Sequence, residues 1–136
     1  MDTTAQTVEI ATPDGPMATP TYRPADGSPR PAVLVIMEAF GVDAHIMDVA
    51  RRLATEGYVT AAPDLFHRGG RLASAPYDKL AEHRDQLRVG FSDQTVLSDV
   101  EAAVRQLQTD PGVKGPIGIV GFCLGGRVSF VSAANV

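Results

Sequence analysis

A short apolar segment, "AVLVIM" at residues 32–37, limits the folds open to this chain more than any other stretch. Such an unbroken run, rich in β-branched residues, is typical of a strand buried on both faces. An amphipathic helix pattern follows, with apolar residues at positions 46, 49, 50 and 53 and a terminating glycine at Gly57. A second short apolar run at residues 58–63 completes a strand–helix–strand unit. This order predicts an α/β fold with a mostly parallel sheet and flanking helices.

The remaining segments extend this pattern within a single domain, residues 1–136. Near the start, Pro13, Asp14 and Gly15 lie between β-prone pieces and predict a short antiparallel hairpin. Residues 77–87 predict a short helix, and a longer one capped by Ser92 or Asp93 ends in the turn-forming residues 109–116. A third buried strand, "IGIVGF" at residues 117–122, then leads into a final helix.

Composition narrows the classes of partner and compartment. The net charge is −4 and the 12 Lys and Arg residues are scattered, which argues against a nucleic-acid partner. No apolar run approaches the roughly 20 residues needed to span a bilayer, and the first residues do not resemble a signal peptide. The single cysteine cannot form an internal disulfide, which fits a reducing compartment. We therefore expect a soluble, cytoplasmic protein that does not bind membranes.

That cysteine lies in "GFCLGG", between the third strand and the final helix. Gly121, Cys123 and Gly125 form the G-x-nucleophile-x-G pattern of a nucleophile elbow, in the strand–turn–helix context that this motif requires. The sharp turn needs small residues two positions to either side, because strand and helix approach closely there. A helix N-terminus also favours the thiolate form, and the Leu124 N–H can serve as an oxyanion-hole donor.

The segment around Cys123 is also open to other interpretations. Cys123 could be a small buried hydrophobe or a redox-sensitive thiol, although the strand–turn–helix context favours the nucleophile. The glycines do not have the spacing of a dinucleotide-binding loop, and no Lys-Ser/Thr pair follows as in a P-loop. We expect no cofactor and no metal.

Glu38 directly follows the first buried strand. Because open α/β sheets place their sites at the carboxyl ends of strands, Glu38 and Cys123 are expected at neighbouring strand ends. The Ala39 N–H is the best candidate for a second oxyanion donor. On position alone, a solvated or helix-capping role for Glu38 is equally open.

Two segments, "MEAFGVDAHIMDVARRLATEGYVTAAPDLFHR" and "GFCLGG", resemble the dienelactone hydrolase (carboxymethylenebutenolidase) family, a branch of the α/β-hydrolase superfamily. The resemblance runs from about residue 8 to residue 136. It implies that Cys123 opens a small-molecule lactone or ester, that Glu38 governs ionisation of the thiol, and that Leu124 and Ala39 hold the oxyanion. It also implies an arginine that binds the substrate carboxylate, for which Arg71, Arg84 and Arg88 are the candidates. From the residues alone, a solvated surface position is the favoured interpretation for all three.

In the family pattern an acid and a histidine follow the nucleophile. Only 13 residues follow Cys123, and none is Asp, Glu or His. His45, His67 and His83 precede the elbow and are expected to be surface or capping residues. We therefore expect the N-terminal part of such a domain, with a sheet left incomplete after the nucleophile strand and with weak or no activity of its own. The alternative is a non-catalytic fragment that associates with itself or another chain through the open sheet edge.

Overall fold

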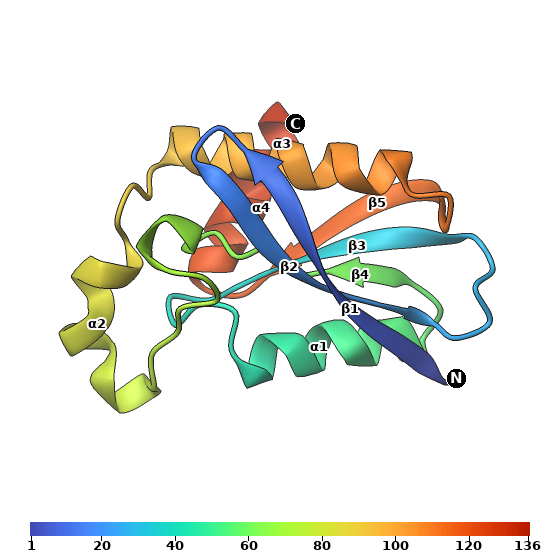
Figure 1. Ribbon diagram of the computed structural model, residues 1–136, viewed down its shortest axis with the longest axis horizontal. Coiled ribbons are helices and arrows are strands. Elements are labelled where there is room, and N and C mark those ends of the chain that lie inside the picture. Colours follow the sequence, from blue (N-terminus) through green and yellow to red (C-terminus); the bar gives the residue numbers. More distant parts are fainter.

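The computed structural model describes all residues, 1–136, and begins with a long hairpin (Figure 1). Strands β1 (Thr3–Thr12) and β2 (Gly15–Pro24) pair antiparallel over their whole length. Gly15 at the turn has φ +112°, a conformation that favours glycine. The predicted hairpin is therefore confirmed, although its strands, of ten residues each, are longer than expected.

The hairpin joins a five-stranded sheet of order β1-β2-β4-β3-β5. Strands β3 (Arg30–Ile36), β4 (Val59–Ala61) and β5 (Val113–Gly121) supply two parallel pairings, β3 with β4 and β3 with β5. Strand β2 pairs antiparallel with β4. The α/β class is confirmed, but the sheet is mixed rather than mostly parallel, because the hairpin adds to its edge instead of standing apart. At the other edge β5 bonds to β3 alone, so the sheet ends at this strand.

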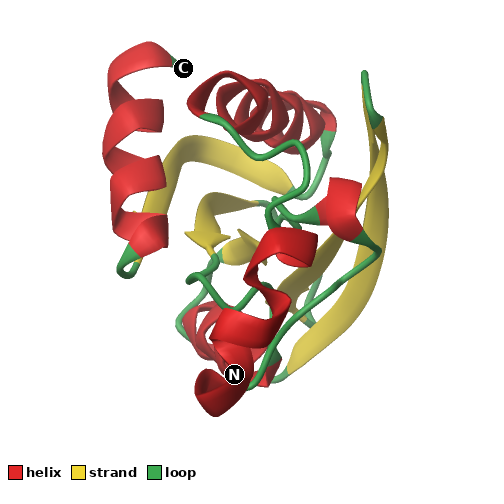
Figure 2. Cartoon of the chain, turned by 90° about the vertical axis from the view of Figure 1, so that its left-hand side faces the viewer, coloured by secondary structure: helices red, strands yellow, loops and turns green.

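Helices cover both faces of the sheet, with α1 (Ala44–Thr55) on one side and α3 (Asp93–Thr109) and α4 (Leu124–Asn135) on the other (Figure 2). On β4, the Thr60 hydroxyl donates to the Ala50 carbonyl of α1 over 2.8 Å. The helix ends follow the sequence signals. The Asp43 carboxylate accepts the Ile46 N–H at the start of α1, and Ser92 forms a capping box at the start of α3.

Some boundaries differ from the sequence expectation. β4 has three residues, and the expected helix at 77–87 is a 3₁₀ turn, Tyr77–Lys79, followed by α2 (Leu80–Leu87). β5 begins at Val113, inside a stretch expected to be a turn, and contains Pro116. An edge strand tolerates proline because its outer N–H groups have no ladder partner. The register with β3 is irregular there, between Arg30 and Ala32.

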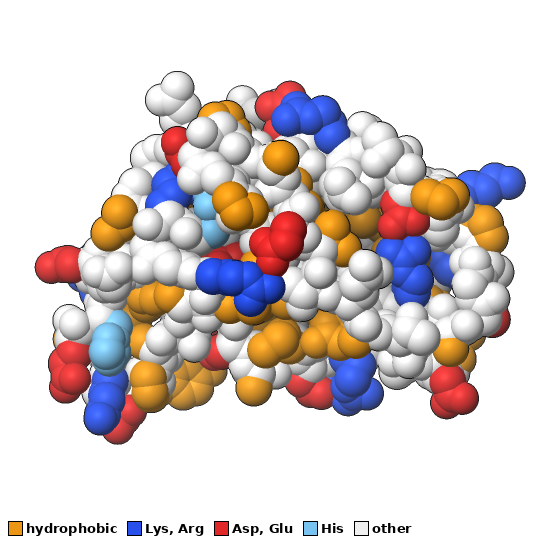
Figure 3. Space-filling model, in the orientation of Figure 1, with side chains coloured by type: hydrophobic (Ala, Val, Ile, Leu, Met, Phe, Trp, Pro, Cys, Tyr) orange, Lys and Arg blue, Asp and Glu red, His pale blue; other side chains and the backbone are white.

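The core lies between the sheet and its helices, and its largest fully buried side chains include Met17, Leu34, Ile36, Met37, Ile46 and Phe66. On α4, by contrast, Phe130 is 79% exposed. On the face shown in Figure 3, Lys and Arg side chains are dispersed among acidic ones. None of the helices has the length and apolar character that a membrane crossing requires.

Candidate active site

Cys123 occupies the turn between β5 and α4 with φ +56° and ψ −116°. A positive φ is uncommon for a residue with a side chain and marks local strain. The N–H groups of Gly126 and Arg127 donate to the Cys123 carbonyl and anchor the turn to the helix. The residue is exposed, so it is not the buried hydrophobe that the sequence left open. The geometry is that of a strained turn presenting a thiol to solvent.

The two flanking glycines are required by close backbone approach. A Cβ at Gly121 would collide with the backbone of Gly125. A Cβ at Gly125 would lie 2.5 Å from the Ile36 carbonyl oxygen and 2.7 Å from that of Met37. The expected need for small residues is therefore confirmed, and Gly125 additionally lets α4 approach the end of β3.

Glu38 lies at the neighbouring strand end. In the parallel register Ile36 is opposite Gly121, and Glu38 and Cys123 each follow these partners by two residues. The Glu38 side chain is 19% exposed. Its carbonyl accepts the Gly41 N–H over 3.2 Å, which closes the loop 38–41 into a tight turn. The structure thus places Glu38 and Cys123 two residues beyond the paired carboxyl ends of β3 and β5, as expected.

The two N–H groups expected to hold an oxyanion belong to the same region. Leu124 is the first residue of α4, so its N–H is among those that a helix leaves without an intrahelical partner. The Ala39 N–H donates to no acceptor of the protein. Both groups are free to serve a ligand.

His45 makes a contact with Glu38 that was not predicted from the sequence. Its Nε2 lies 3.9 Å from Oε1 of Glu38, although the ring is 52% exposed. The helix is capped by Asp43, so His45 is not a capping residue. The short loop between β3 and α1 is the sequence feature that could have predicted this contact, because it brings the first turn of α1 back over the end of β3.

A buried ionic cluster lies beyond β4. Asp99 of α3 is fully buried and accepts two hydrogen bonds from Arg68, each of 2.8 Å. His67 approaches the same carboxylate, with Nε2 3.3 Å from Oδ1, and Arg68 also bonds Asp14 of the hairpin turn. The His67 side chain is only 2% exposed, so its expected surface position was wrong. The reason is that α3, 32 residues further on, supplies a carboxylate that the local sequence does not reveal.

Asp64 is a second buried carboxylate in this region. It is fully buried, and its oxygens accept the N–H groups of Phe66 (3.1 Å) and Leu72 (2.6 Å). Burial raises the pKa of Asp64 above its ordinary value, and the two N–H donors only partly oppose this effect.

The arginine candidates are not gathered at the elbow. Arg71 is exposed and bonds Glu9 of β1 over 2.6 Å. Arg84 is exposed on α2, together with His83, and Arg88 is partly buried at the end of that helix. The expected surface position therefore suits both Arg71 and Arg84, and neither Arg84 nor Arg88 has an ion-pair partner.

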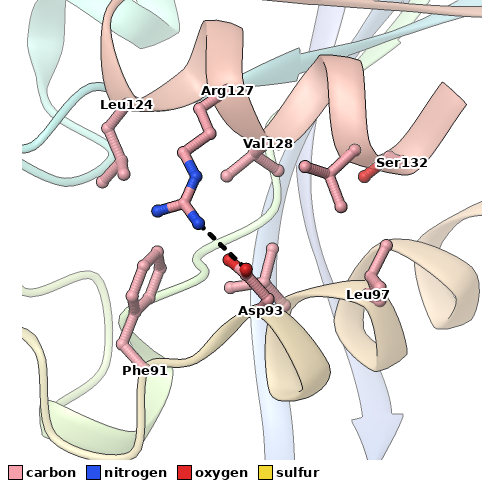
Figure 4. A pocket seen from close by; sticks show the side chains of 9 residues that line it. Phe91, Asp93, Leu97, Leu124, Arg127, Val128 and Ser132 are labelled. Atoms are coloured by element: carbon pink, nitrogen blue, oxygen red, sulfur yellow. Dashed lines mark hydrogen bonds and ion pairs between the residues drawn. The ribbon is translucent and has the colours of Figure 1, made fainter. Parts of the chain in front are cut away.

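A small pocket lies directly behind the elbow, between α3 and α4 (Figure 4). Phe91 and Leu124 line one end, and Arg127 bridges the two helices by bonding Asp93 over 2.9 Å. The Ser132 hydroxyl is buried at the other end and has no hydrogen-bond partner. Across the structure no group of three or more His, Cys, Asp or Glu side chains is arranged to hold a metal ion.

Comparison with known proteins agrees with this geometry. The sequence pattern of the dienelactone hydrolase family matches residues 17–136. A Methylorubrum extorquens protein assigned the name carboxymethylenebutenolidase is 39% identical over 131 residues, covering 94% of this chain and 44% of that protein. The carboxymethylenebutenolidase of Pseudomonas putida is 32% identical over 110 residues, covering 79% and 47%.

Solved structures give the same result. A crystal structure of a Klebsiella pneumoniae protein assigned to the dienelactone hydrolases superposes with a TM-score of 0.85 at 32% identity, covering 100% of this chain and 56% of that one. A dienelactone hydrolase-like promiscuous phosphotriesterase from metagenomic libraries superposes with a TM-score of 0.80 at 27% identity, covering 98% and 54%. The chain thus spans about half the length of the relatives it matches. Because the family pattern extends over β2 to α4 and includes the elbow, this chain belongs to the dienelactone hydrolase family.

Proposed function

We propose that this chain carries the nucleophile of a hydrolase that cleaves a lactone or small carboxylic ester, with Cys123 as that nucleophile. The observation that carries the proposal is the exposed thiol at a strained turn, beside the free N–H of Ala39 and the first N–H of α4. A reducing cytoplasm would keep this single thiol available.

In the proposed reaction the Cys123 thiol gives its proton to the Glu38 carboxylate, and the sulfur attacks the substrate carbonyl carbon. The new S–C bond pushes the carbonyl electron pair onto oxygen, where the N–H groups of Leu124 and Ala39 stabilise the oxyanion. Collapse restores the carbonyl and breaks the C–O bond of the ester. The leaving oxygen takes up the proton, and an acyl thioester remains. Water then attacks the thioester, releases the carboxylic acid and returns a proton to sulfur.

We infer that these 136 residues alone turn over weakly or not at all. None of the residues after Cys123 is an Asp, Glu or His that could activate the water. Removing members of a catalytic triad commonly costs orders of magnitude in rate. Acylation of Cys123 is therefore expected to outpace release of the acyl group. Arg84 and Arg88, which have no ion-pair partner, stay the better candidates for a substrate carboxylate than Arg71.

The test is acylation of the purified chain by p-nitrophenyl acetate, followed by release of p-nitrophenol and by intact-mass spectrometry. We expect a single acyl group per chain, carried by Cys123, and slow release afterwards. Cys123→Ala should show neither the burst nor the adduct. Equal acylation of both proteins, or rapid Cys123-dependent turnover by the wild-type chain, would contradict the proposal.

A second candidate, association without catalysis, is favoured by the outer edge of β5. This strand bonds to a neighbour on one side only, and Phe122 and Phe130 are exposed in and near α4. An unpaired edge offers N–H and carbonyl groups to another strand. Sedimentation velocity separates the two candidates, since a stable, well-folded monomer would count against association.

A further inference from the structure

The loop that carries Glu38 and Ala39 is backed by a second segment, residues 72–77, which we call the bracing segment. Within it, the Ala75 N–H donates to the Phe40 carbonyl over 3.0 Å. The rings of Tyr77 and Phe40 meet edge to face, with centroids 4.2 Å apart. The loop 38–41 is therefore held from behind by a backbone hydrogen bond and an aromatic contact.

Gly41 shows how closely the two segments approach. A Cβ at this position would collide with the Ala73 carbonyl oxygen and lie 3.2 Å from the Cα of Ser74. Gly41 is itself bonded to the Glu38 carbonyl. A displacement of the bracing segment would thus act directly on the turn that orients Glu38 and the Ala39 N–H.

The bracing segment begins at a strained residue. Leu72 has φ +51°, which a side-chain-bearing residue rarely adopts unless the surroundings impose it. Its N–H donates to the Asp64 carboxylate over 2.6 Å, and the other oxygen of Asp64 accepts the Phe66 N–H. Asp64 itself follows β4, so this carboxylate fixes the first residue of the bracing segment to the sheet.

Asp64 has no ionic partner that would explain its burial, so its main structural role is to accept hydrogen bonds, above all the one from the Leu72 N–H. The carboxylate is fully buried and forms no ion pair. The titratable side chains that act on the pKa of Asp64 are His67 and Asp99, and Asp99 forms a bidentate contact with Arg68. A buried carboxylate without a cation is retained only where its acceptors satisfy specific donors.

We propose that Asp64 is a positioning residue for the oxyanion loop: it holds Leu72 in its left-handed conformation and thereby keeps the bracing segment against loop 38–41. This inference rests on the proposed function of Ala39 and Glu38. Asp64 acts through Leu72 and the bracing segment and touches neither substrate nor Cys123.

The decisive variants are Asp64→Ala, Leu72→Gly and the double variant. Alanine has no side-chain oxygen, so neither the Leu72 N–H nor the Phe66 N–H keeps its acceptor. Glycine adopts a positive φ without strain and so removes the need for the clamp. Asp48→Ala, the same chemical change at an exposed residue of α1, is the matched control.

The first readout is amide hydrogen exchange, which does not depend on catalysis. In Asp64→Ala we expect the Ala75 amide to exchange at least about tenfold faster while the amides of α1 are unchanged. The double variant should regain at least half of the lost protection on a logarithmic scale. Equal acceleration in α1 would indicate global destabilisation and would overturn the proposal.

The second readout is the rate of Cys123 acylation by p-nitrophenyl acetate. Because loss of a whole oxyanion donor costs about 10²–10³ in rate, a misaligned one is expected to cost about tenfold at saturating ester, with the half-saturating concentration unchanged. Faster exchange without slower acylation would overturn the positioning role. If neither the wild-type chain nor any variant is acylated, the proposed function fails, while the exchange data still test the Asp64–Leu72 hydrogen bond.

Folding failure is also informative. If Asp64→Ala does not fold but the double variant does, Asp64 acts through Leu72 as proposed. If neither folds, Asp64 is needed for the fold independently of Leu72, and the proposal is wrong.

Discussion

Replacing Gly125 by alanine tests whether the elbow depends on close approach of α4 to β3. The added Cβ would lie 2.5 Å from the Ile36 carbonyl oxygen and 2.7 Å from that of Met37, and both are backbone atoms of a fully buried strand end. Overpacking of this kind costs about 1–3 kcal/mol, and the rigid neighbours place this site at the upper end. Alanine regains up to about 1 kcal/mol of helix propensity. We therefore expect a net loss of about 2 kcal/mol in the free energy of unfolding.

Gly126→Ala is the matched control, one residue further along the same helix. Its Cβ would meet only the Gly121 carbonyl oxygen, at an ordinary 3.6 Å, so we expect a change between zero and about 1 kcal/mol of stabilisation. Urea unfolding followed by circular dichroism measures both variants, and iodoacetamide labelling of Cys123 in native buffer reports on the elbow. Equal unfolding midpoints for the two variants would refute the close-packing argument.

Further predictions concern buried polar groups. Ser132→Ala should stabilise the chain by about 1 kcal/mol because it removes a buried hydroxyl that has no hydrogen-bond partner. Ser129→Ala loses a 2.7 Å hydrogen bond to the Gly125 carbonyl and should change stability by less than about 0.5 kcal/mol; thermal melts measure both variants. Arg68→Met should destabilise the chain by about 3 kcal/mol or more, since it removes the bidentate cation from the buried Asp99 carboxylate and leaves only His67 beside it. The exposed Arg71→Met should cost less than about 1 kcal/mol, and similar urea midpoints for the two variants would contradict the reasoning. Hydrogen bonds from Arg23 lower the pKa of Asp110. The Asp110 carboxylate therefore stabilises the fold at pH values above the ordinary carboxyl range, and this contribution is lost as the pH falls through the lowered pKa. Asp110→Asn should therefore cost about 1 kcal/mol at pH 7 and progressively less as the pH falls below the ordinary carboxyl range, and a pH-independent loss would exclude this origin.

Much of the local structure was predictable because its causes are local. Pro13 to Gly15 formed the expected hairpin turn, and Ser92 capped the expected helix. Gly121 and Gly125 were predicted as necessary neighbours of Cys123, and the structure shows the backbone contacts that require them. The placement of Glu38 beside the elbow followed from the rule that parallel strands share a carboxyl edge.

Other features were not predictable from residue patterns, because they join segments that are far apart in the chain. The hairpin could have stood alone, and only the pairing of β2 with β4 made the sheet mixed. His67 was expected at the surface, but its side chain is buried because α3 places Asp99 against it.

The residue pattern established the strand–turn–helix order, the caps and the strained elbow, since each depends on side chains within a few positions of one another. The tertiary structure established which buried charges meet and which loop supports which. Asp64 reaches Leu72, and the segment that follows reaches Phe40 and Gly41. Contacts of this kind form only when the sheet and its helices close around a shared core, so no local pattern encodes them.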